Sequence, residues 1–143
     1  MIRKANLKDL EAIINLEEKI FKHSLGYSFL RQELLENPFS RIFVYEKDDV
    51  IIGYISFRVI DKNADIMNFL IDLPFQGLGY GKELFKTILY ELKAEGVDTL
   101  VLEVRSKNEK AISLYEKFGA KHIRTLKNYY GDDDAYMMIM EVK

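Results

Sequence analysis

A run in the middle of the chain combines three glycines and a lysine at a spacing suited to binding an anion. It falls between an apolar run and a helical pattern, and it reads Gln76-Gly77-Leu78-Gly79-Tyr80-Gly81-Lys82. Glycine lets successive backbone N–H groups point towards one site without crowding by a Cβ atom. The first turn of a helix adds unpaired N–H groups and the positive end of the helix dipole. The run therefore predicts a phosphate or pyrophosphate site.

Two common nucleotide-binding loops do not match this run. A Walker loop requires G-x-x-x-x-G-K-[ST], but Gly77 to Lys82 is one residue too short and Glu83 stands where the hydroxyl residue belongs. A dinucleotide loop requires G-x-G-x-x-G, but Lys82 or Leu84 occupies the position of its third glycine. The run instead resembles the Q/R-x-x-G-x-G/A pyrophosphate loop of the GNAT-type N-acetyltransferases, whose ligand is acetyl-CoA. For the loop taken alone, a tight strand-to-helix turn without a ligand is the alternative.

Glu103 lies inside a near-continuous apolar run, residues 99 to 104, which is typical of a strand buried on both faces. A buried carboxylate without partners is costly to ionise. Desolvation would raise the pKa of Glu103 and make it a better base near neutral pH. The alternative is a structural ion pair with Arg105, which follows on the same face of the strand.

Tyr115 and Asn108 belong to the helix predicted after that strand. Tyr115 lies on the apolar face, so it is either a core residue or a proton donor whose hydroxyl points into a cleft. With a phenol pKa near ~10 and a thiol pKa near ~8.5, protonation of a leaving thiolate by tyrosine costs only about 2 kcal/mol. Asn108 is either a polar residue at the start of the helix or a hydrogen-bond partner of a ligand that lies along the sheet.

The polar segment near the C-terminus contains candidates for binding an acceptor substrate. Tyr129 and Tyr130 precede an acidic turn, residues 132–134. Acidic side chains beside an acceptor site would favour a basic peptide. The alternative is a solvated turn between two strands.

Length and composition bound the class of protein. The chain has 143 residues, which predicts a single domain over residues 1–143. It is 48% hydrophobic and 31% charged, as an ordinary soluble protein is. A net charge of −2 gives no reason to expect direct nucleic-acid binding. No transmembrane run or signal-peptide core is present, so we expect a cytoplasmic protein that contacts no membrane. Without cysteine, and with two isolated histidines, the chain predicts no metal site.

Hydrophobic periodicity predicts the elements that position these residues. Strands are expected at residues 2–5, 41–46, 50–59, 64–71, 99–104, 121–126 and 135–142. Helices are expected after an Asn6 cap, at residues 28–36, from the glycine run to residue 95, and after a Ser106-x-x-Glu109 capping box. The order β-α-α-β-β-β-α-β-α-β-β indicates an α/β (α+β) architecture, a mixed sheet with helices on both faces.

Taken together, the second half of the chain resembles the RimI-type ribosomal-protein alanine N-acetyltransferases. The resemblance rests on the glycine run and on Leu102-Glu103-Val104-Arg105-x-x-Asn108-x-x-Ala111-x-x-Leu114-Tyr115-x-x-x-Gly119, followed by Asn128-Tyr129-Tyr130 and Asp134-Ala135-x-x-Met138. It implies the GNAT acyl-CoA N-acyltransferase fold. It also implies direct transfer of the acetyl group of acetyl-CoA to the N-terminal α-amine of a protein, such as a ribosomal protein.

The resemblance also implies roles for individual residues. Glu103 matches the general base and Tyr115 the general acid. The residues matched to acetyl-CoA binding are Phe69, Leu70, Ile71, Gln76, Gly77, Leu78, Gly79, Tyr80, Gly81, Lys82 and Asn108. Two other functions remain open: an acetyltransferase that acts on lysine or a small-molecule amine, and a non-catalytic acyl-CoA sensor.

Overall fold

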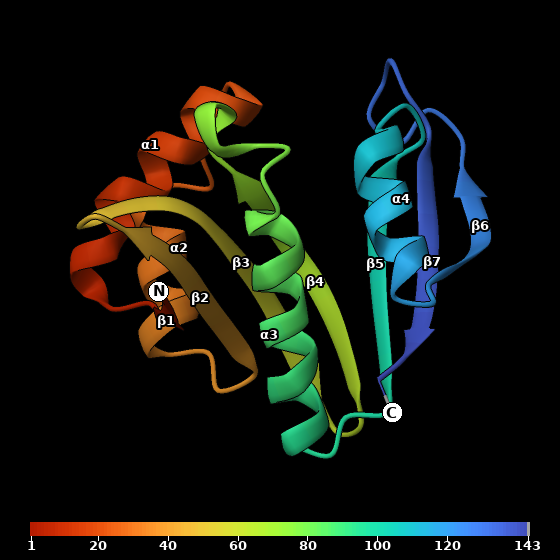
Figure 1. Cartoon of the computed structure of the whole chain (residues 1–143), viewed down its shortest axis with the longest axis horizontal. Helices are drawn as coiled ribbons and strands as arrows, with labels where there is room; N and C mark the ends of the chain where they lie inside the picture. Colours follow the sequence, from red (N-terminus) through yellow and green to blue (C-terminus); the bar gives the residue numbers. More distant parts are fainter. Residues whose placement is uncertain (143) are drawn as a thin grey trace.

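The computed structural model describes residues 1–142 and contains one seven-stranded sheet, in the order β1-β2-β3-β4-β5-β7-β6 (Figure 1). The strands are β1 (Ile2–Lys4), β2 (Ser40–Lys47), β3 (Val50–Ile60), β4 (Asn63–Ile71), β5 (Thr99–Arg105), β6 (Lys121–Leu126) and β7 (Ala135–Glu141). The helices are α1 (Leu10–Phe21), α2 (Tyr27–Leu35), α3 (Tyr80–Ala94) and α4 (Glu109–Lys117). The predicted order of elements is confirmed. Residue 143, the last of the predicted domain range, lies outside the described residues.

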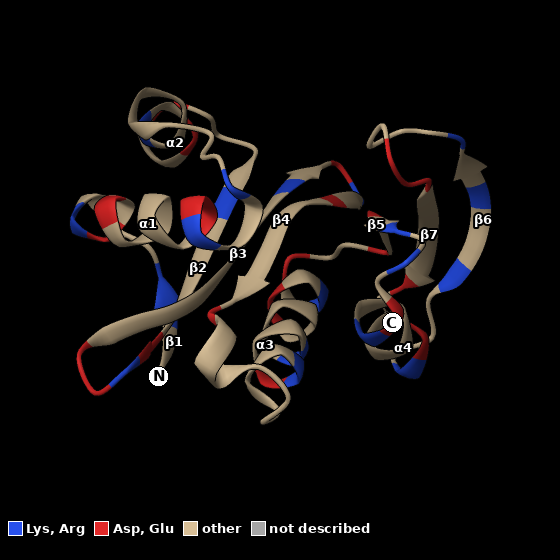
Figure 2. Cartoon of the chain, turned by 90° about the horizontal axis from the view of Figure 1, so that it is seen from above, with Lys and Arg blue, Asp and Glu red and all other residues tan. Residues whose placement is uncertain are grey.

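The helices lie on both faces of the sheet, as the sequence predicted. Helices α1 and α2 cover one face, and α3 and α4 cover the other (Figure 2). The apolar stripes of the helices explain this arrangement, because a helix buries the face on which its apolar residues recur. Each face of the sheet has its own hydrophobic core. The apolar stripe of α1 contributes Leu10, Ile13 and Leu16 to one core, and the stripe of α3 contributes Leu84, Phe85, Ile88 and Leu92 to the other.

The sheet is interrupted between β4 and β5, which are the only parallel neighbours in the described chain. The two strands pair only between residues 63–65 and 99–101. Beyond these pairs they diverge (Figure 1), so the ends of β4 and β5 each have an edge without a partner strand. Because unpaired strand edges expose backbone N–H and C=O groups, this opening can accept a ligand.

The sequence predicts a capping box at the start of two helices, and the structure confirms one of them. Asn6 and Asp9 form the expected capping box, although it opens a short 3₁₀ helix, Leu7–Asp9, that leads into α1. The capping box predicted from Ser106 to Glu109 is wrong. Asn108 caps α4 instead, through Ala111 N–H at 3.2 Å, because the Ser106 hydroxyl is used by Asp133.

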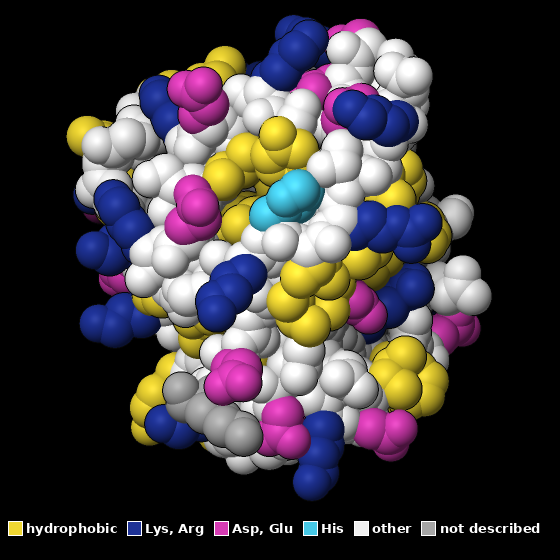
Figure 3. Space-filling model, turned by 90° about the vertical axis from the view of Figure 1, so that its right-hand side faces the viewer, with side chains coloured by type: hydrophobic (Ala, Val, Ile, Leu, Met, Phe, Trp, Pro, Cys, Tyr) yellow, Lys and Arg dark blue, Asp and Glu magenta, His cyan; other side chains and the backbone are white. Residues whose placement is uncertain are grey.

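The surface carries charges of both signs. On the side formed by β6 and β7, Lys and Arg side chains are interspersed with Asp and Glu (Figure 3). Among residues 1–142, no helix has both the length and the apolar character needed to cross a membrane.

Candidate active site

The glycine run forms the turn between β4 and α3. Gly77 and Gly79 have φ values of 76° and 92°, in the left-handed region that side chains with a Cβ rarely adopt. A Cβ added at either position would meet no atom within 4 Å, so the requirement is conformational and not steric. Gly81 differs, because it lies in the first turn of α3 without a positive φ. Two of the three glycines therefore shape the turn.

The backbone amides at this turn are available to a ligand. The N–H of Glu83 is the first of α3 to find an acceptor, Gly79 O at 3.0 Å. Among residues 1–142, the N–H groups of residues 77–82 donate to no backbone or side-chain acceptor. Successive free amides at a helix N-terminus form an anion site. The geometry therefore has the form that the sequence predicted.

A groove of about 690 Å³ runs beside these amides, and we call it the glycine-loop groove. It is lined by nearly all the residues predicted to bind acetyl-CoA, namely Phe69, Leu70, Ile71, Gln76, Gly77, Gly79, Gly81, Lys82 and Asn108. Leu78 and Tyr80 are the exceptions. The Leu78 side chain is 66% exposed, and the Tyr80 ring packs edge-on against Tyr45 and Phe75. Neither residue lines the groove.

Two further lysines line the glycine-loop groove, and the sequence analysis did not identify them. Lys110 and Lys117 lie on the same face of α4, with Ser113 and Leu114 between them. Together with Lys82 they give the groove three cations. Their helical spacing, seven residues apart, was the available signal.

The open edge of β4 offers backbone groups to the same groove. Asp72 N–H donates to Ile52 O of β3 at 2.7 Å. In an antiparallel ladder the direction of the N–H alternates along the strand, so Leu70 N–H also points to β3, whereas those of Phe69 and Ile71 point to the open edge. The carbonyl of Ile71 on that edge accepts from Gln76 Nε2 at 2.8 Å. Gln76 thus ties the glycine run to β4.

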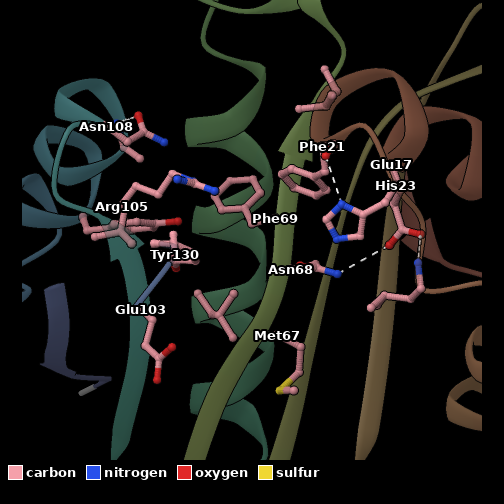
Figure 4. A pocket seen from close by; sticks show the side chains of 16 residues that line it. Glu17, Phe21, His23, Met67, Asn68, Phe69, Glu103, Arg105, Asn108 and Tyr130 are labelled. Atoms are coloured by element: carbon pink, nitrogen blue, oxygen red, sulfur yellow. Dashed lines mark hydrogen bonds between the residues drawn. The ribbon is translucent and has the colours of Figure 1, made fainter. Parts of the chain in front are cut away.

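A second cavity of about 480 Å³, the Glu103 cleft, adjoins the groove, with which it shares Ile20, Phe21, Phe69, Asn108, Ala111 and Tyr115. Figure 4 shows its two walls. Glu103, Arg105 and Tyr130 lie on one wall, and Glu17, His23 and Asn68 lie on the other. Both predicted catalytic residues, Glu103 and Tyr115, line this cleft.

The predicted burial of Glu103 is wrong. Leu102 and Val104 are buried, but Glu103 and Arg105 are exposed. The apolar run was misleading because β5 packs against α3 and α4 on one face only. The alternative ion pair with Arg105 is also absent from the described residues: the Arg105 guanidinium bonds to Asp132 at 3.2 Å and lies 4.2 Å from the centre of the Tyr130 ring. Glu103 is left facing the cleft.

Tyr115 is a core residue whose hydroxyl nevertheless reaches the cleft. Its ring is 6% exposed and packs against Phe69 and Phe85. The Tyr115 hydroxyl makes no hydrogen bond among residues 1–142. In the same residues, every side-chain N or O atom that is fully buried has a hydrogen-bond partner, so this hydroxyl is not fully buried. The hydroxyl therefore contacts the cleft surface. Burial, followed by the nearby Tyr130, raises the pKa of Tyr115 above its ordinary value.

Tyr129 and Tyr130, the two residues proposed to line the acceptor side, lie beside Glu103. Tyr130 lines the Glu103 cleft, and the Glu103 carboxylate raises the pKa of the exposed Tyr129. The three acidic residues of the turn differ in their surroundings. Asp132 pairs with Arg105, Asp134 pairs with Lys127, and Asp133 is buried.

Three polar residues of the cleft come from the first half of the chain, where no motif indicated chemistry. Glu17 lies on α1, His23 follows it, and Asn68 lies on β4. Glu17 is 1% exposed and accepts from Tyr54, Ser24 and Asn68 side chains. A glutamate in the middle of an apolar helical stripe was its only sequence signal. Among residues 1–142 there is no group of three or more His, Cys, Asp or Glu side chains that could hold a metal ion.

The described geometry agrees with comparisons with known proteins. A model of the acetyltransferase (GNAT) family matches residues 8–120. The chain therefore belongs to this family and is an acetyltransferase.

Known relatives align with most of the chain. The ribosomal protein bS18-alanine N-acetyltransferase of Haemophilus influenzae is 36% identical over 122 residues, which cover 82% of this chain and 75% of that protein. The N-alpha-acetyltransferase of Sulfurisphaera tokodaii is 30% identical over 151 residues, covering 96% and 90%. The crystal structure of the ribosomal-protein-S18-alanine N-acetyltransferase from Escherichia coli superimposes with a TM-score of 0.91 at 26% identity, over 100% of this chain and 94% of that one.

Proposed function

We propose that this acetyltransferase transfers the acetyl group of acetyl-CoA directly to the N-terminal α-amine of a protein. The observation that carries the proposal is the junction of the two cavities: Phe69, Asn108 and Tyr115 line both the glycine-loop groove and the Glu103 cleft. A donor held in the groove would therefore present its reactive end to the cleft. The similarity to relatives named for N-terminal acetylation supports an α-amine as acceptor.

The groove fits the donor on three counts. The free amides of residues 77–82 and the Lys82 side chain suit a diphosphate. The open edge of β4, at Phe69 and Ile71, suits an extended chain with amide groups. Lys110 and Lys117 add charge that complements phosphate. Bound acetyl-CoA would supply an acetyl thioester to the cleft.

Glu103 and Tyr115 would move the two protons of the reaction. Glu103 accepts the proton that the amine loses as it forms the new amide bond, and Tyr115 donates its hydroxyl proton to the sulfur that leaves. Because Glu103 is exposed, a bridging water is the natural path between amine and carboxylate. The N–H groups of Phe69 and Ile71 would polarise the thioester carbonyl. The chain has no cysteine, so no acyl-cysteine can form and transfer is direct.

An α-amine suits this site better than a lysine. The amine must be neutral to attack, and an α-amine has a pKa near ~8 compared with ~10.4 for lysine. Deprotonating lysine at neutral pH would therefore cost roughly 3 kcal/mol more. The more acidic amine is therefore the better match to a carboxylate base such as Glu103.

The wider assignments follow from the same relatives. A ribosomal protein is the acceptor we would test first, because the Haemophilus influenzae relative is named for one. We assign residues 1–143 to a single domain, which the presence of one seven-stranded sheet supports, and we expect the protein to act in the cytoplasm.

A peptide panel tests the proposal. The purified chain is incubated with acetyl-CoA and with peptides that differ only in their acceptor: a free α-amine, a blocked α-amine with an internal lysine, or neither. Mass spectrometry should locate the acetyl group on the α-amine. Acetylation of lysine alone would reject the α-amine, and binding of acetyl-CoA by calorimetry without any transfer would indicate a sensor.

A further inference from the structure

Four carboxylates are buried in the described chain: Asp9, Glu17, Glu33 and Asp133. Burying a charge is costly unless it is paired or fully hydrogen-bonded. Two of the four are paired with an arginine side chain. Asp9 is paired with Arg3 at 2.8 Å, and Glu33 is paired with Arg58 at 2.8 Å.

Glu17 and Asp133 have no cationic partner among residues 1–142, and each is held by hydrogen bonds alone. Each accepts from a serine hydroxyl and from the backbone N–H of the residue that follows that serine. For Glu17 these donors are Ser24 Oγ at 2.7 Å and Leu25 N at 3.2 Å. For Asp133 they are Ser106 Oγ at 2.5 Å and Lys107 N at 3.3 Å.

The two carboxylates stand behind opposite walls of the Glu103 cleft. Glu17 itself lines the wall that contains Asn68 and His23 (Figure 4). On the wall that contains Glu103, the Tyr130 N–H donates to the backbone carbonyl of Asp133 at 3.0 Å, so the Asp133 carboxylate belongs to the same turn as Tyr130. Of the four carboxylates only Glu17 lines the cleft itself, whereas Asp133 is joined to it through the turn that carries Tyr130.

The hydrogen bonds of Glu17 join three parts of its wall. One oxygen accepts from Ser24 and Leu25 in the α1–α2 loop, and the other accepts from Tyr54 on β3 and from Asn68 on β4, the latter at 3.4 Å. A carboxylate has about four lone-pair positions, so Glu17 has no position left for a substrate. It can fix the wall but not contact the acceptor.

Asp133 fixes its wall in the same way. It bridges the end of β5, through Ser106 and Lys107, to the turn before β7, through Asp134 N at 2.8 Å. The hydrogen bond from the Ser106 hydroxyl is the main reason why the pKa of the Asp133 carboxyl lies below its usual range. These donors therefore stabilise the charged form of Asp133.

We propose that Glu17 and Asp133 are positioning residues that fix the two walls of the Glu103 cleft and thereby set its affinity for the acceptor peptide. This inference rests on the proposed function. Each carboxylate holds a loop that would otherwise move, the α1–α2 loop on one side and the β6–β7 turn on the other. Acetyl-CoA binding does not depend on either one.

The test compares four isosteric variants: Glu17→Gln and Asp133→Asn at the cleft, and Glu33→Gln and Asp9→Asn as matched controls. An amide keeps the shape but replaces one acceptor oxygen with a donor. All four should lower the melting temperature. Only the first two should raise the KM for the peptide, by about tenfold, with kcat changed less and the Kd for acetyl-CoA within about twofold of wild type. Equal changes of KM in the controls would overturn the inference.

Hydrogen exchange gives a readout that needs no peptide. Glu17→Gln should speed exchange of residues 22–26, and Asp133→Asn should speed exchange of residues 127–134, while the controls leave both segments unchanged. Ser24→Ala removes the hydroxyl that donates to Glu17 and accepts from Gly26 N–H, and it serves if Glu17→Gln does not fold; it should affect residues 22–26 alone, at amides other than that of Gly26. If the wild type acetylates no peptide, the proposed function is rejected, and the positioning role of Glu17 and Asp133 is then judged from hydrogen exchange alone. Unchanged exchange in both cleft variants would reject the positioning role.

Discussion

Glu103 and Tyr115 reach the same cleft from opposite faces of the sheet. Tyr115 packs with Leu102 and Val104 in the core beneath α3 and α4, whereas Glu103 points to the other face because side chains alternate along a strand. They can act on one substrate only because β4 and β5 separate beyond residues 65 and 101. The opening between the strands is therefore as necessary to the proposed chemistry as the two side chains.

Replacing Glu103 with glutamine should lower kcat by about 10²-fold or more, because the amide cannot accept the amine proton. The Kd for acetyl-CoA, measured by calorimetry, should not change, since Glu103 lies outside the glycine-loop groove. Glu141→Gln, an exposed glutamate on β7 paired opposite the start of β5, is the control. Wild-type turnover of Glu103→Gln between pH 6 and 9 would exclude the base assignment.

Tyr115→Phe should lower kcat by about tenfold to 10²-fold while the ring keeps its packing. Because burial raises the pKa of this phenol, donation to a thiolate costs more than the ~2 kcal/mol that ordinary pKa values give. Tyr90→Phe, at an exposed position of α3, is the matched control. If Tyr115→Phe turns over at the wild-type rate, Tyr115 is a packing residue only.

At the scale of elements, the strand–turn–helix unit of β4 and α3 depends on two left-handed residues. Gly79→Ala should weaken acetyl-CoA binding about tenfold, because relief of the strain at φ 92° would turn the free amides away from the groove. The strain should also lower the free energy of unfolding by about 1–2 kcal/mol.

Gly96 provides a control on the same helix. It has a φ of 82° at the C-terminal end of α3, and a Cβ there would also meet nothing within 4 Å. Gly96→Ala should therefore cost similar stability and leave the Kd for acetyl-CoA unchanged. A binding loss shared by both variants would show that strain, and not the amides, is responsible.

At the scale of the whole molecule, the first strand is joined to the start of α1 by an ion pair. Asp9 accepts from the Arg3 guanidinium at 2.8 and 2.9 Å and from Asn6 N–H at 2.8 Å. The hydrogen bonds from Arg3 lower the pKa of Asp9 below its ordinary value, against the opposing effect of burial. The ionised form therefore stabilises the fold above the unfolded pKa of ~3.9, and that stability is lost as the pH falls through the folded value.

Urea unfolding across pH 7 to pH 2.5 checks this linkage. Asp9→Asn should be less stable than wild type at pH 7, and the difference should shrink below about pH 4 as wild type loses the ionised carboxylate. Asp48→Asn, at a side chain that is 91% exposed, is the control and should follow wild type. A difference that stays constant with pH would contradict the assignment.

The order of elements, the two-faced covering of the sheet and the loop beside α3 were all predicted from local patterns. Helical stripes such as that of α3, the glycines at residues 77 and 79, and the alternation of short strands report on each segment by itself. A motif that joins residues 102 to 138 also sufficed to indicate the family, which the family model confirms.

Only the tertiary structure decided which surfaces are buried and which residues meet. The apolar run around Glu103 looks the same whether one face of a strand is covered or both, so its exposure depended on which helices pack there. Likewise, Glu17 on α1 lines one wall of the cleft and Asp133 near the C-terminus belongs to the turn that carries Tyr130 on the other wall, and the two walls are apart because β4 and β5 separate between them. The periodicity of a sequence shows which face of a single helix or strand is apolar. It does not show this cleft, which forms where two strands do not pair.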